Sequence, residues 1–286
     1  MPPPTHSLPG NRDLELQSLE DWPALTTLRV SGWQYRFAGG FTRRVNSVQA
    51  NTPLDIPLEE AIAACEAAAR GQGLPTVFRL HPHVHPGGLD GVLAARGYAQ
   101  EGETAVQTLA LTAGAAGSGW GPSGTGATVL AGWRGPWLTA FLQVSRQLGK
   151  MLPRPGAPGG TGTTPPPPGQ ADPGEMMAAI LGKIPGAQGC ALITGGEGEP
   201  LALGRAVCTG PRLGVYDILT HPGHRGRGLG RLIMEALLAW GLSQGARWAY
   251  LAVEADNRPA LALYHRLGFR EAYRYWYRVQ PPGPSR

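Results

Sequence analysis

The segment THPGHRGRGLGRLIMEALLAWG, residues 220–241, combines closely spaced glycines and arginines with an apolar pattern of helical period. Its apolar positions recur every three or four residues, which predicts a helix that begins close to Gly228. Gly226, Gly228 and Gly230 then line the first turn. A helix N-terminus presents N–H groups without partners in the helix, and it carries partial positive charge. Because glycine has no Cβ, a ligand can approach this backbone closely, so the segment predicts an anion site, first of all for a phosphate group.

The detail of the motif decides between phosphate ligands. The glycines read G-x-G-x-G, which misses the dinucleotide fingerprint G-x-G-x-x-G, and no G-K-[ST] follows as a P-loop requires. The pattern Arg225-x-x-Gly228-x-Gly230, directly after the strand-like LGVYDILT, resembles the GNAT superfamily of N-acetyltransferases, whose R/Q-x-x-G-x-G/A loop holds the pyrophosphate of acetyl-CoA. Taken alone, the loop also allows a glycine-rich turn with solvated arginines.

A second motif downstream strengthens the resemblance. ARWAYLAVEADNRPALALYHRLGF predicts a strand, a turn and a helix with Pro259 in its first turn and Gly268 just past its end. The family pattern N-x-x-A-x-x-x-Y-x-x-x-G-F is matched by Asn257, Ala260, Tyr264, Gly268 and Phe269. Two motifs in the family's order are more specific than one, and the resemblance runs from about residue 213 to residue 279.

The resemblance implies an acetyl-CoA-dependent N-acetyltransferase, in which an amine attacks the thioester directly within a ternary complex. It assigns the cosubstrate acetyl-CoA to residues in three places. The backbone of Ile218, Leu219 and Thr220 would hold the pantetheine and the acetyl carbonyl, and Asn257 the pantetheine arm. The pyrophosphate would lie on Arg225, Gly226, Arg227, Gly228, Leu229 and Gly230. Tyr264 would also contact the cosubstrate and protonate the leaving thiolate; the alternative for Tyr264 is a core aromatic residue of an amphipathic helix.

The general base is less defined by the motifs. Asp217 on the strand before the loop is the first candidate, Glu254 at the end of the next strand the second, and His221 a third. Some family members carry a glutamate two residues ahead of Glu254, where this chain has Ala252. Asp217 could act through a water molecule, or it could be an ordinary carboxylate at a strand edge.

Composition divides the chain. Residues 112–128 are rich in Gly and Ala and predict a linker, and the Pro/Gly-rich residues 152–175 predict an insertion. The C-terminal domain, residues 129–286, then reads as strand, two helices, a hairpin turning near residues 195–200, and strand, helix, strand, helix, strand. This is the GNAT order of elements. The fold class we expect is α/β of the α+β type, with mixed, mostly antiparallel sheets flanked by helices.

Residues 1–111 predict a second, degenerate GNAT-like domain. They show a hairpin at Gly39-Gly40, helices over residues 58–70 and 89–96, and a strand over residues 76–80. The ending LAARGYAQEGETAVQTLAL parallels LYHRLGFREAYRYWYRVQ. Where a phosphate loop would stand, NTPLDIP offers two prolines and no glycine. We therefore expect two GNAT-like domains with about one acetyl-CoA site per chain, in the C-terminal one.

The cysteine pattern and the lack of a recognisable targeting signal predict a cytoplasmic protein. Cys65, Cys190 and Cys208 form no C-x-x-C pair, which suits a reducing compartment, although Cys190 and Cys208 could face each other across the hairpin. No apolar run is long enough to span a membrane, and MPPPTHSLPGNRD lacks the apolar core of a signal peptide.

Two features invite other functions. The net charge of +5 invites a nucleic-acid hypothesis, but the arginines are spread out and no recognised nucleic-acid module is present, so we do not expect such a partner. In HPHVHPGG, His81, His83 and His85 could face one side of an extended segment as metal ligands. The adjacent prolines and glycines favour an irregular loop instead, and we expect no metal.

An N-acetyltransferase acting on an amine is the function favoured by the two motifs together. The alternative is a catalytically idle acyl-CoA-binding or regulatory protein of the same fold, which turnover would distinguish. The acceptor and the oligomeric state are not readable from the sequence.

Overall fold

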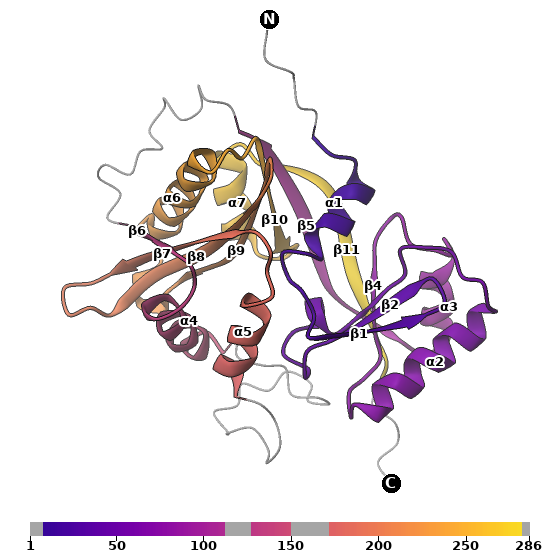
Figure 1. Ribbon diagram of the computed structural model, residues 1–286. Coiled ribbons are helices and arrows are strands. Elements are labelled where there is room, and N and C mark those ends of the chain that lie inside the picture. The colour runs from indigo at the N-terminus through magenta and orange to yellow at the C-terminus, as the bar shows by residue number, and fades with distance from the viewer. Residues whose placement is uncertain (1–7, 112–126, 150–171, 282–286) are drawn as a thin grey trace, which may run out of the picture. The chain divides into compact units, whose positions relative to one another are not determined.

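The computed structural model describes residues 8–111, 127–149 and 172–281 (Figure 1). The chain forms two compact units, each assembled from three stretches. Unit 1 comprises the described residues of Met1–Asp21, Val106–Met151 and Ile184–Ala272, and unit 2 those of Trp22–Ala105, Leu152–Lys183 and Tyr273–Arg286. Two long strands, β5 (Ala99–Ala110) and β11 (Arg270–Val279), contribute residues to both units.

Unit 2 is a sheet of short strands with helices beside it. Its strands follow the order β1-β2-β3-β4-β11-β5, in which β3 and β4 are parallel and the pairs β1–β2, β2–β3 and β4–β11 are antiparallel. The elements are β1 (Thr26–Val30), β2 (Trp33–Phe37), the 3-10 turn η1 (Arg43–Val45), β3 (Val48–Gln49), α2 (Leu58–Gly71), β4 (Val77–Leu80), α3 (Leu89–Ala95) and α5 (Pro173–Leu181).

The core of unit 2 forms where apolar residues of period 3.6 meet apolar residues of period 2. Helix α2 buries Ile62 and Cys65 in the same cluster as Trp33 and Phe78 of the sheet. The rings of Trp33 and Phe78 meet edge to face with centroids 5.7 Å apart, an arrangement that the quadrupoles of aromatic rings favour.

Unit 1 contains a second set of strands, in the order β5-β10-β9-β8-β7-β6. Strands β9 and β10 are parallel, and β6–β7, β7–β8 and β8–β9 are antiparallel. Helix α6 lies along one side of these strands and α4 along the other (Figure 1). The elements are α1 (Asn11–Ser18), β6 (Thr128–Ala131), α4 (Pro136–Gln147), β7 (Ala187–Thr194), β8 (Pro200–Thr209), β9 (Arg212–Thr220), the 3-10 turn η3 (Pro222–His224), α6 (Leu229–Ser243), β10 (Trp248–Glu254) and α7 (Arg258–Arg266).

This architecture confirms the predicted fold class, a mixed and mostly antiparallel sheet flanked by helices. The helix expected from Gly228 begins at Leu229 with Gly228 as its N-cap, and the predicted hairpin turns between β7 and β8. Helix α1 and strand β1 were not predicted. Four of the five residues of β1 are exposed, so the strand lacks the apolar alternation that would reveal it.

The boundaries of the compact units differ from those of the predicted domains. The predicted domains, residues 1–111 and 129–286, are continuous in sequence, whereas the units exchange segments through β5 and β11. Helix α5, expected within the C-terminal domain, belongs to unit 2. The predicted linker lies outside the described residues over residues 112–126, and so does the predicted insertion over residues 152–171.

The cysteine pair considered across the hairpin does not form. Cys190 is opposite Arg205 in the β7–β8 register, and Cys208 is opposite Ala187, so the two thiols occupy different rungs of the ladder. All three cysteines are buried and free. Burial raises the pKa of the Cys190 thiol to about 12, which keeps it protonated at neutral pH.

The histidines of HPHVHPGG lie in the irregular segment between β4 and α3. His81 is buried, and its Nε2 lies 2.7 Å from Oδ1 of Asn51. Within residues 8–111, 127–149 and 172–281, no group of three or more His, Cys, Asp or Glu side chains is arranged to hold a metal ion. None of the described helices is long and apolar enough to cross a membrane.

Candidate functional site

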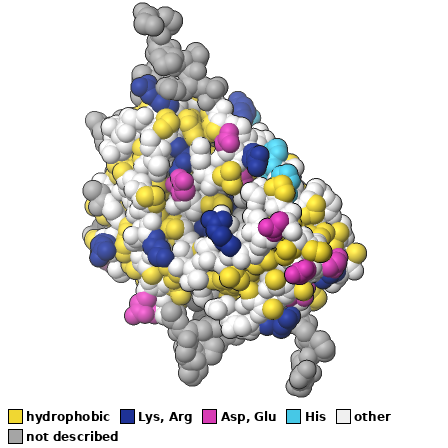
Figure 2. Space-filling model, turned by 45° about the vertical axis from the view of Figure 1, so that its right-hand side comes forward, with side chains coloured by type: hydrophobic (Ala, Val, Ile, Leu, Met, Phe, Trp, Pro, Cys, Tyr) yellow, Lys and Arg dark blue, Asp and Glu magenta, His cyan; other side chains and the backbone are white. Residues whose placement is uncertain are grey.

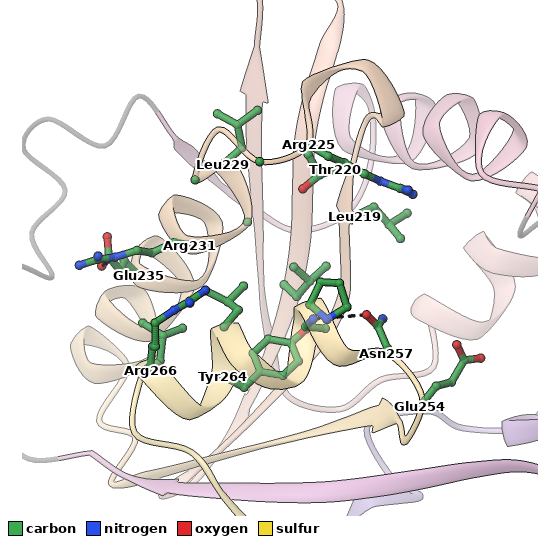
Figure 3. A pocket seen from close by; sticks show the side chains of 18 of the residues that line it. Leu219, Thr220, Arg225, Leu229, Arg231, Glu235, Glu254, Asn257, Tyr264 and Arg266 are labelled. Carbon is green, nitrogen blue, oxygen red and sulfur yellow. Dashed lines mark hydrogen bonds and ion pairs between the residues drawn. The ribbon is translucent and has the colours of Figure 1, made fainter.

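Unit 1 contains a cavity of about 1160 Å³ at the N-terminal end of α6. Helices α6 and α7 and the ends of β9 and β10 form most of its wall (Figure 3). Ten of the eleven residues that the family resemblance assigns to acetyl-CoA line it: Ile218, Leu219, Thr220, Arg225, Gly226, Gly228, Leu229, Gly230, Asn257 and Tyr264. The eleventh, Arg227, is not part of the wall; its Nη1 lies 3.5 Å from Nδ1 of His224.

The N-terminus of α6 is an open backbone cradle. Gly226 and Gly228 have φ of 77° and 78°, in the left-handed region that residues with a Cβ rarely adopt. A Cβ at either position would meet no atom within 4 Å. Among the described residues, no hydrogen bond takes up the backbone N–H groups from Gly226 to Gly230. The loop therefore presents five consecutive N–H donors and the positive end of the helix dipole.

The ends of β9 and β10 form a second open backbone edge. The parallel register between them runs only as far as Val215 and Leu251, although β9 continues to Thr220. The N–H of His221 bonds to Leu201 on the β8 side. Because backbone groups alternate along a strand, those of Ile218 and Thr220 point away from β8, toward the side that β10 has left. This edge can accept or donate hydrogen bonds to a ligand in the cavity.

Tyr264 projects from α7 into the same space as the open edge (Figure 3). Its side chain is buried, and burial raises the pKa of its phenol to about 12. The ring packs edge to face against Phe269, with centroids 6.1 Å apart. Within the described part of the chain, its hydroxyl forms no hydrogen bond. The Tyr264 phenol is thus protonated at neutral pH, and its hydroxyl can donate a hydrogen bond to a ligand in the cavity.

Asn257 caps the helix that carries Tyr264. Its Oδ1 accepts a hydrogen bond from the N–H of Ala260 at 3.3 Å, as an N-cap does. The side-chain NH₂ of Asn257 donates to no other described residue, and the amide lies on the cavity wall (Figure 3). One side chain can therefore both start α7 and contact a ligand.

The three candidate bases occupy different surroundings. Glu254 lines the cavity at the end of β10 (Figure 3). Asp217 is not part of the wall, and its Oδ2 accepts a hydrogen bond from Nε of Arg205 at 3.0 Å. His221 is also absent from the wall, and its Nδ1 accepts from the N–H of Gly223 at 3.1 Å. Of the three, only Glu254 faces the space where a ligand fits.

Charges of both signs surround the cavity. Arg225 and Arg266 line it, together with Glu254 and Asp256. Arg231, on the first turn of α6, pairs with Glu235 one turn later at 2.7 Å. On the face of the molecule drawn in Figure 2, basic side chains are scattered and acidic ones lie between them.

Sequence reasoning missed some of the wall. Leu109 of β5, Leu148 after α4 and Arg266 of α7 line the cavity, but nothing in their local sequence distinguishes them from other apolar or basic residues. Arg205 was missed as well, although a signal exists: one arginine in the otherwise apolar strand PLALGRAVCT requires a partner if that strand is buried.

The chain is similar in sequence to known acetyltransferases. Residues 169–269 match the acetyltransferase (GNAT) family. The uncharacterized N-acetyltransferase YobR of Bacillus subtilis is 24% identical over 273 residues, covering 94% of this chain and 98% of that protein. Streptothricin acetyltransferase of Streptomyces lavendulae is 41% identical over 58 residues, which is 20% of this chain and 31% of the relative.

Solved structures share the fold. A GCN5-related N-acetyltransferase from Kribbella flavida aligns with a TM-score of 0.58 at 17% identity over 95% of both chains. A tandem GNAT protein from the clavulanic acid biosynthesis pathway aligns with a TM-score of 0.56 at 16% identity, over 81% of this chain and 76% of that one. These likenesses concern the fold, whereas the family match covers the residues of the cradle and of α7. The C-terminal part of the chain, residues 169–269, carries a GNAT acetyltransferase domain, and the protein is an acyltransferase.

Proposed function

We propose that this protein transfers the acetyl group of acetyl-CoA to an amine by direct attack in a ternary complex, with one active site per chain. The observation that carries the proposal is the meeting of three features in one cavity: the N–H cradle from Gly226 to Gly230, the open edge of β9, and the hydroxyl of Tyr264. The cavity of about 1160 Å³ exceeds the volume of about 300–1,000 Å³ usual for drug-sized ligands. Its volume leaves room for a cosubstrate larger than most drug-sized ligands, such as acetyl-CoA.

The cradle suits the pyrophosphate of the cosubstrate. Its donors are backbone N–H groups at a helix N-terminus, the arrangement that binds phosphates in many folds. The open positions at Gly226 and Gly228 let phosphate oxygens approach these donors without meeting a Cβ. Arg225, on the wall, adds a positive charge that can reach a phosphate. Asn257 is proposed to hold the pantetheine arm through its side-chain NH₂.

The open edge of β9 suits the acyl end. The backbone of Ile218 to Thr220 would pair with the amides of the pantetheine as a neighbouring strand would, because β10 has diverged there. An N–H on this edge would also donate to the thioester oxygen as negative charge develops on it, and such preorganised donors account for much of enzymatic rate enhancement.

Tyr264 is proposed as the general acid. When the amine nitrogen forms its bond to the acetyl carbon, the carbon–sulfur bond breaks and the sulfur takes the electron pair. A phenol whose pKa is raised to about 12 remains protonated throughout the neutral range. It therefore keeps an O–H that can donate a hydrogen bond to the leaving sulfur. Because its pKa lies above the value of about 8.5 for a thiol, full proton transfer to the thiolate is uphill and is completed by a proton from solvent.

Glu254 is proposed as the general base, ahead of Asp217, because it alone of the two lines the cavity. An acceptor arrives mainly as an ammonium ion, which must lose a proton before it can attack. A carboxylate at the cavity edge can remove that proton directly or through a water molecule, and it also attracts the cationic form of the acceptor.

The test is acetyl-CoA turnover with a broad panel of amines, followed as thiol release, together with calorimetric titration of acetyl-CoA. The proposal expects amine-dependent thiol release and a stoichiometry near one per chain. Binding without turnover by any amine would favour the alternative, an idle acyl-CoA-binding protein. A stoichiometry of two would mean that the first half of the chain also binds the cosubstrate.

A further inference from the structure

Strand β9 contains one residue more than the strand opposite it. In the β8–β9 register, Leu203 faces Leu219 and Arg205 faces Tyr216, so Asp217 and Ile218 together face Gly204. This arrangement is a β-bulge, which bends the strand and increases its twist. Asp217 has φ of 56° and is one of two non-glycine residues with positive φ in the described part of the chain. Glycine adopts this conformation more readily, so the presence of aspartate at this position calls for a structural explanation.

The explanation is an ion pair between Asp217 and Arg205. The side chain of Arg205 is fully buried, at 0% exposure, and its Nε donates to Oδ2 of Asp217 at 3.0 Å. Its guanidinium carbon lies 4.8 Å from the centre of the Tyr216 ring. A buried guanidinium is costly unless a carboxylate balances its charge. The ion pair therefore ties β8 to the extra residue of β9.

The opposite side of the bulge is fixed by packing. The carbonyl of Gly204 accepts a hydrogen bond at 2.9 Å from Nε1 of Trp137, whose side chain is also fully buried. A Cβ at Gly204 would come within 2.5 Å of Ile218 Cδ1 and 2.6 Å of Ile233 Cγ2. The residue facing the bulge is thus bonded to α4 and packed against α6, and the bulge cannot slide along the strand.

The bulge lies where the cavity begins. Regular pairing of β9 with β10 ends at Val215, the bulge follows at Asp217, and the residues from Ile218 to Thr220 line the cavity. The conformation at Asp217 consequently sets the direction in which the next three residues present their backbone groups.

We propose that Arg205 and Asp217 form a positioning pair that holds the open edge of β9 in register with the acyl end of acetyl-CoA. The inference rests on the proposed function and deepens it: Asp217 acts through the backbone of Ile218 to Thr220 and does not remove the acceptor's proton. The phosphate cradle is built on α6 and does not depend on this pair. The pair therefore governs turnover much more than affinity for the cosubstrate.

Two substitutions at one position separate this role from that of a base. Asp217→Ala removes the ion pair and the tolerance for positive φ, and we expect kcat to fall about 10–100-fold, the size expected when a reacting group is misplaced by about 1 Å. Its acetyl-CoA dissociation constant should change less than about threefold. Asp217→Asn removes the balancing charge, so its Tm should fall as that of Asp217→Ala does, but it keeps an acceptor for Arg205 and tolerates positive φ. Where it is folded, it should recover most of the activity lost in Asp217→Ala, with an unchanged pH profile.

Asp21 offers the matched control. It is a fully buried carboxylate of the same unit, paired with the buried Arg212 at 3.0 Å, and it does not line the cavity. Asp21→Ala also removes a carboxylate from a buried arginine, although Arg212 keeps Glu20 at 3.0 Å, and it removes the acceptor of the Tyr216 hydroxyl. General destabilisation from the loss of a buried ion pair should therefore appear in both alanine variants. Hydrogen exchange adds a direct readout: acetyl-CoA should protect the amides of Ile218 and Thr220 in the wild type and in Asp217→Asn, but not in Asp217→Ala.

Each result decides a different question. If Asp217→Asn loses at least as much activity as Asp217→Ala and its pH profile loses a limb, Asp217 is a base and the inference is wrong. If Asp217→Ala keeps wild-type kcat and amide protection, the pair is only structural and the inference is again wrong. If the wild type itself neither binds acetyl-CoA nor protects these amides, the proposed function fails, and the inference fails with it.

Discussion

Replacing Gly228 by aspartate tests the phosphate cradle directly. Gly228 is the N-cap of α6 with φ of 78°, and a Cβ there would point into open space. A side chain at this φ costs about 1–2 kcal/mol in stability, which corresponds to a fall in Tm of about 2–8 °C for a domain of this size. The empty protein should therefore still fold.

The charge is what should abolish binding. Two unit charges about 4 Å apart at an effective dielectric constant of about 20 repel each other by about 4 kcal/mol, which is about a thousandfold in dissociation constant. Gly228→Ala carries the same backbone strain without the charge, and it should weaken acetyl-CoA binding no more than about tenfold. The measurement is titration calorimetry of both variants, with thermal unfolding of each.

Gly245 provides the control for strain alone. It lies just past the other end of α6 with φ of 89°, and a Cβ there also meets nothing within 4 Å. Gly245→Ala should lower Tm as Gly228→Ala does while leaving acetyl-CoA affinity unchanged. If Gly228→Asp binds acetyl-CoA within about threefold of the wild type, the anion does not lie on this helix N-terminus and the cradle has been misinterpreted.

Three further predictions concern single side chains. Tyr264→Phe should lower kcat about 100-fold or more while acetyl-CoA affinity stays within about threefold, because only the leaving thiolate uses the hydroxyl; an unchanged kcat with chemistry rate-limiting would remove Tyr264 from the mechanism. Cys190→Ala and Cys208→Ala should remain active if folded, since burial raises the pKa of both thiols and no acyl-enzyme is needed; an acetyl thioester trapped on either would contradict direct transfer. The hydrogen bond from Arg278 holds the pKa of Asp90 below its usual value, so the Asp90–Arg278 pair stabilises the folded protein at pH 7 and this stabilisation is lost as the pH falls below about 4. The Tm difference between the wild type and Asp90→Asn should therefore close as the pH falls below about 4. A Tm difference that stays constant would show that the pair does not stabilise the protein.

The parts of the fold that were predicted are those whose signals are local. The start of α6 follows from apolar spacing and glycine, and the end of α7 from Gly268, whose φ is 97°. Hairpin β7–β8 follows from its glycine-rich turn. Each of these signals lies within about twenty residues, so neighbouring residues alone are enough to produce it.

What could not be predicted depends on contacts distant in sequence. The division into units depends on β5 and β11, each of which contributes to both, and no local pattern reports which residues of a long strand belong to which unit. The antiparallel pairing of β2 with β3 agrees with the hairpin expected at Gly39-Gly40, but the parallel pairing of the two-residue strand β3 with β4 depends on tertiary contacts. Leu109 reaches the cavity wall from β5, which is far from the motifs in sequence.

The candidate bases illustrate the same limit within the site. Asp217 and Glu254 both stand near the ends of strands that lead into family motifs, and by that measure they are equivalent. The structure distinguishes them through a third residue. Arg205 on the neighbouring strand forms an ion pair with Asp217, whereas Glu254 lines the cavity. An arginine inside the buried strand PLALGRAVCT already requires a carboxylate nearby. Asp217 is within reach because β9 is antiparallel to β8, whereas Glu254 lies on β10, beyond β9 in the strand order. If Asp217 is assigned first as the partner of Arg205, Glu254 is the carboxylate that remains as the candidate base.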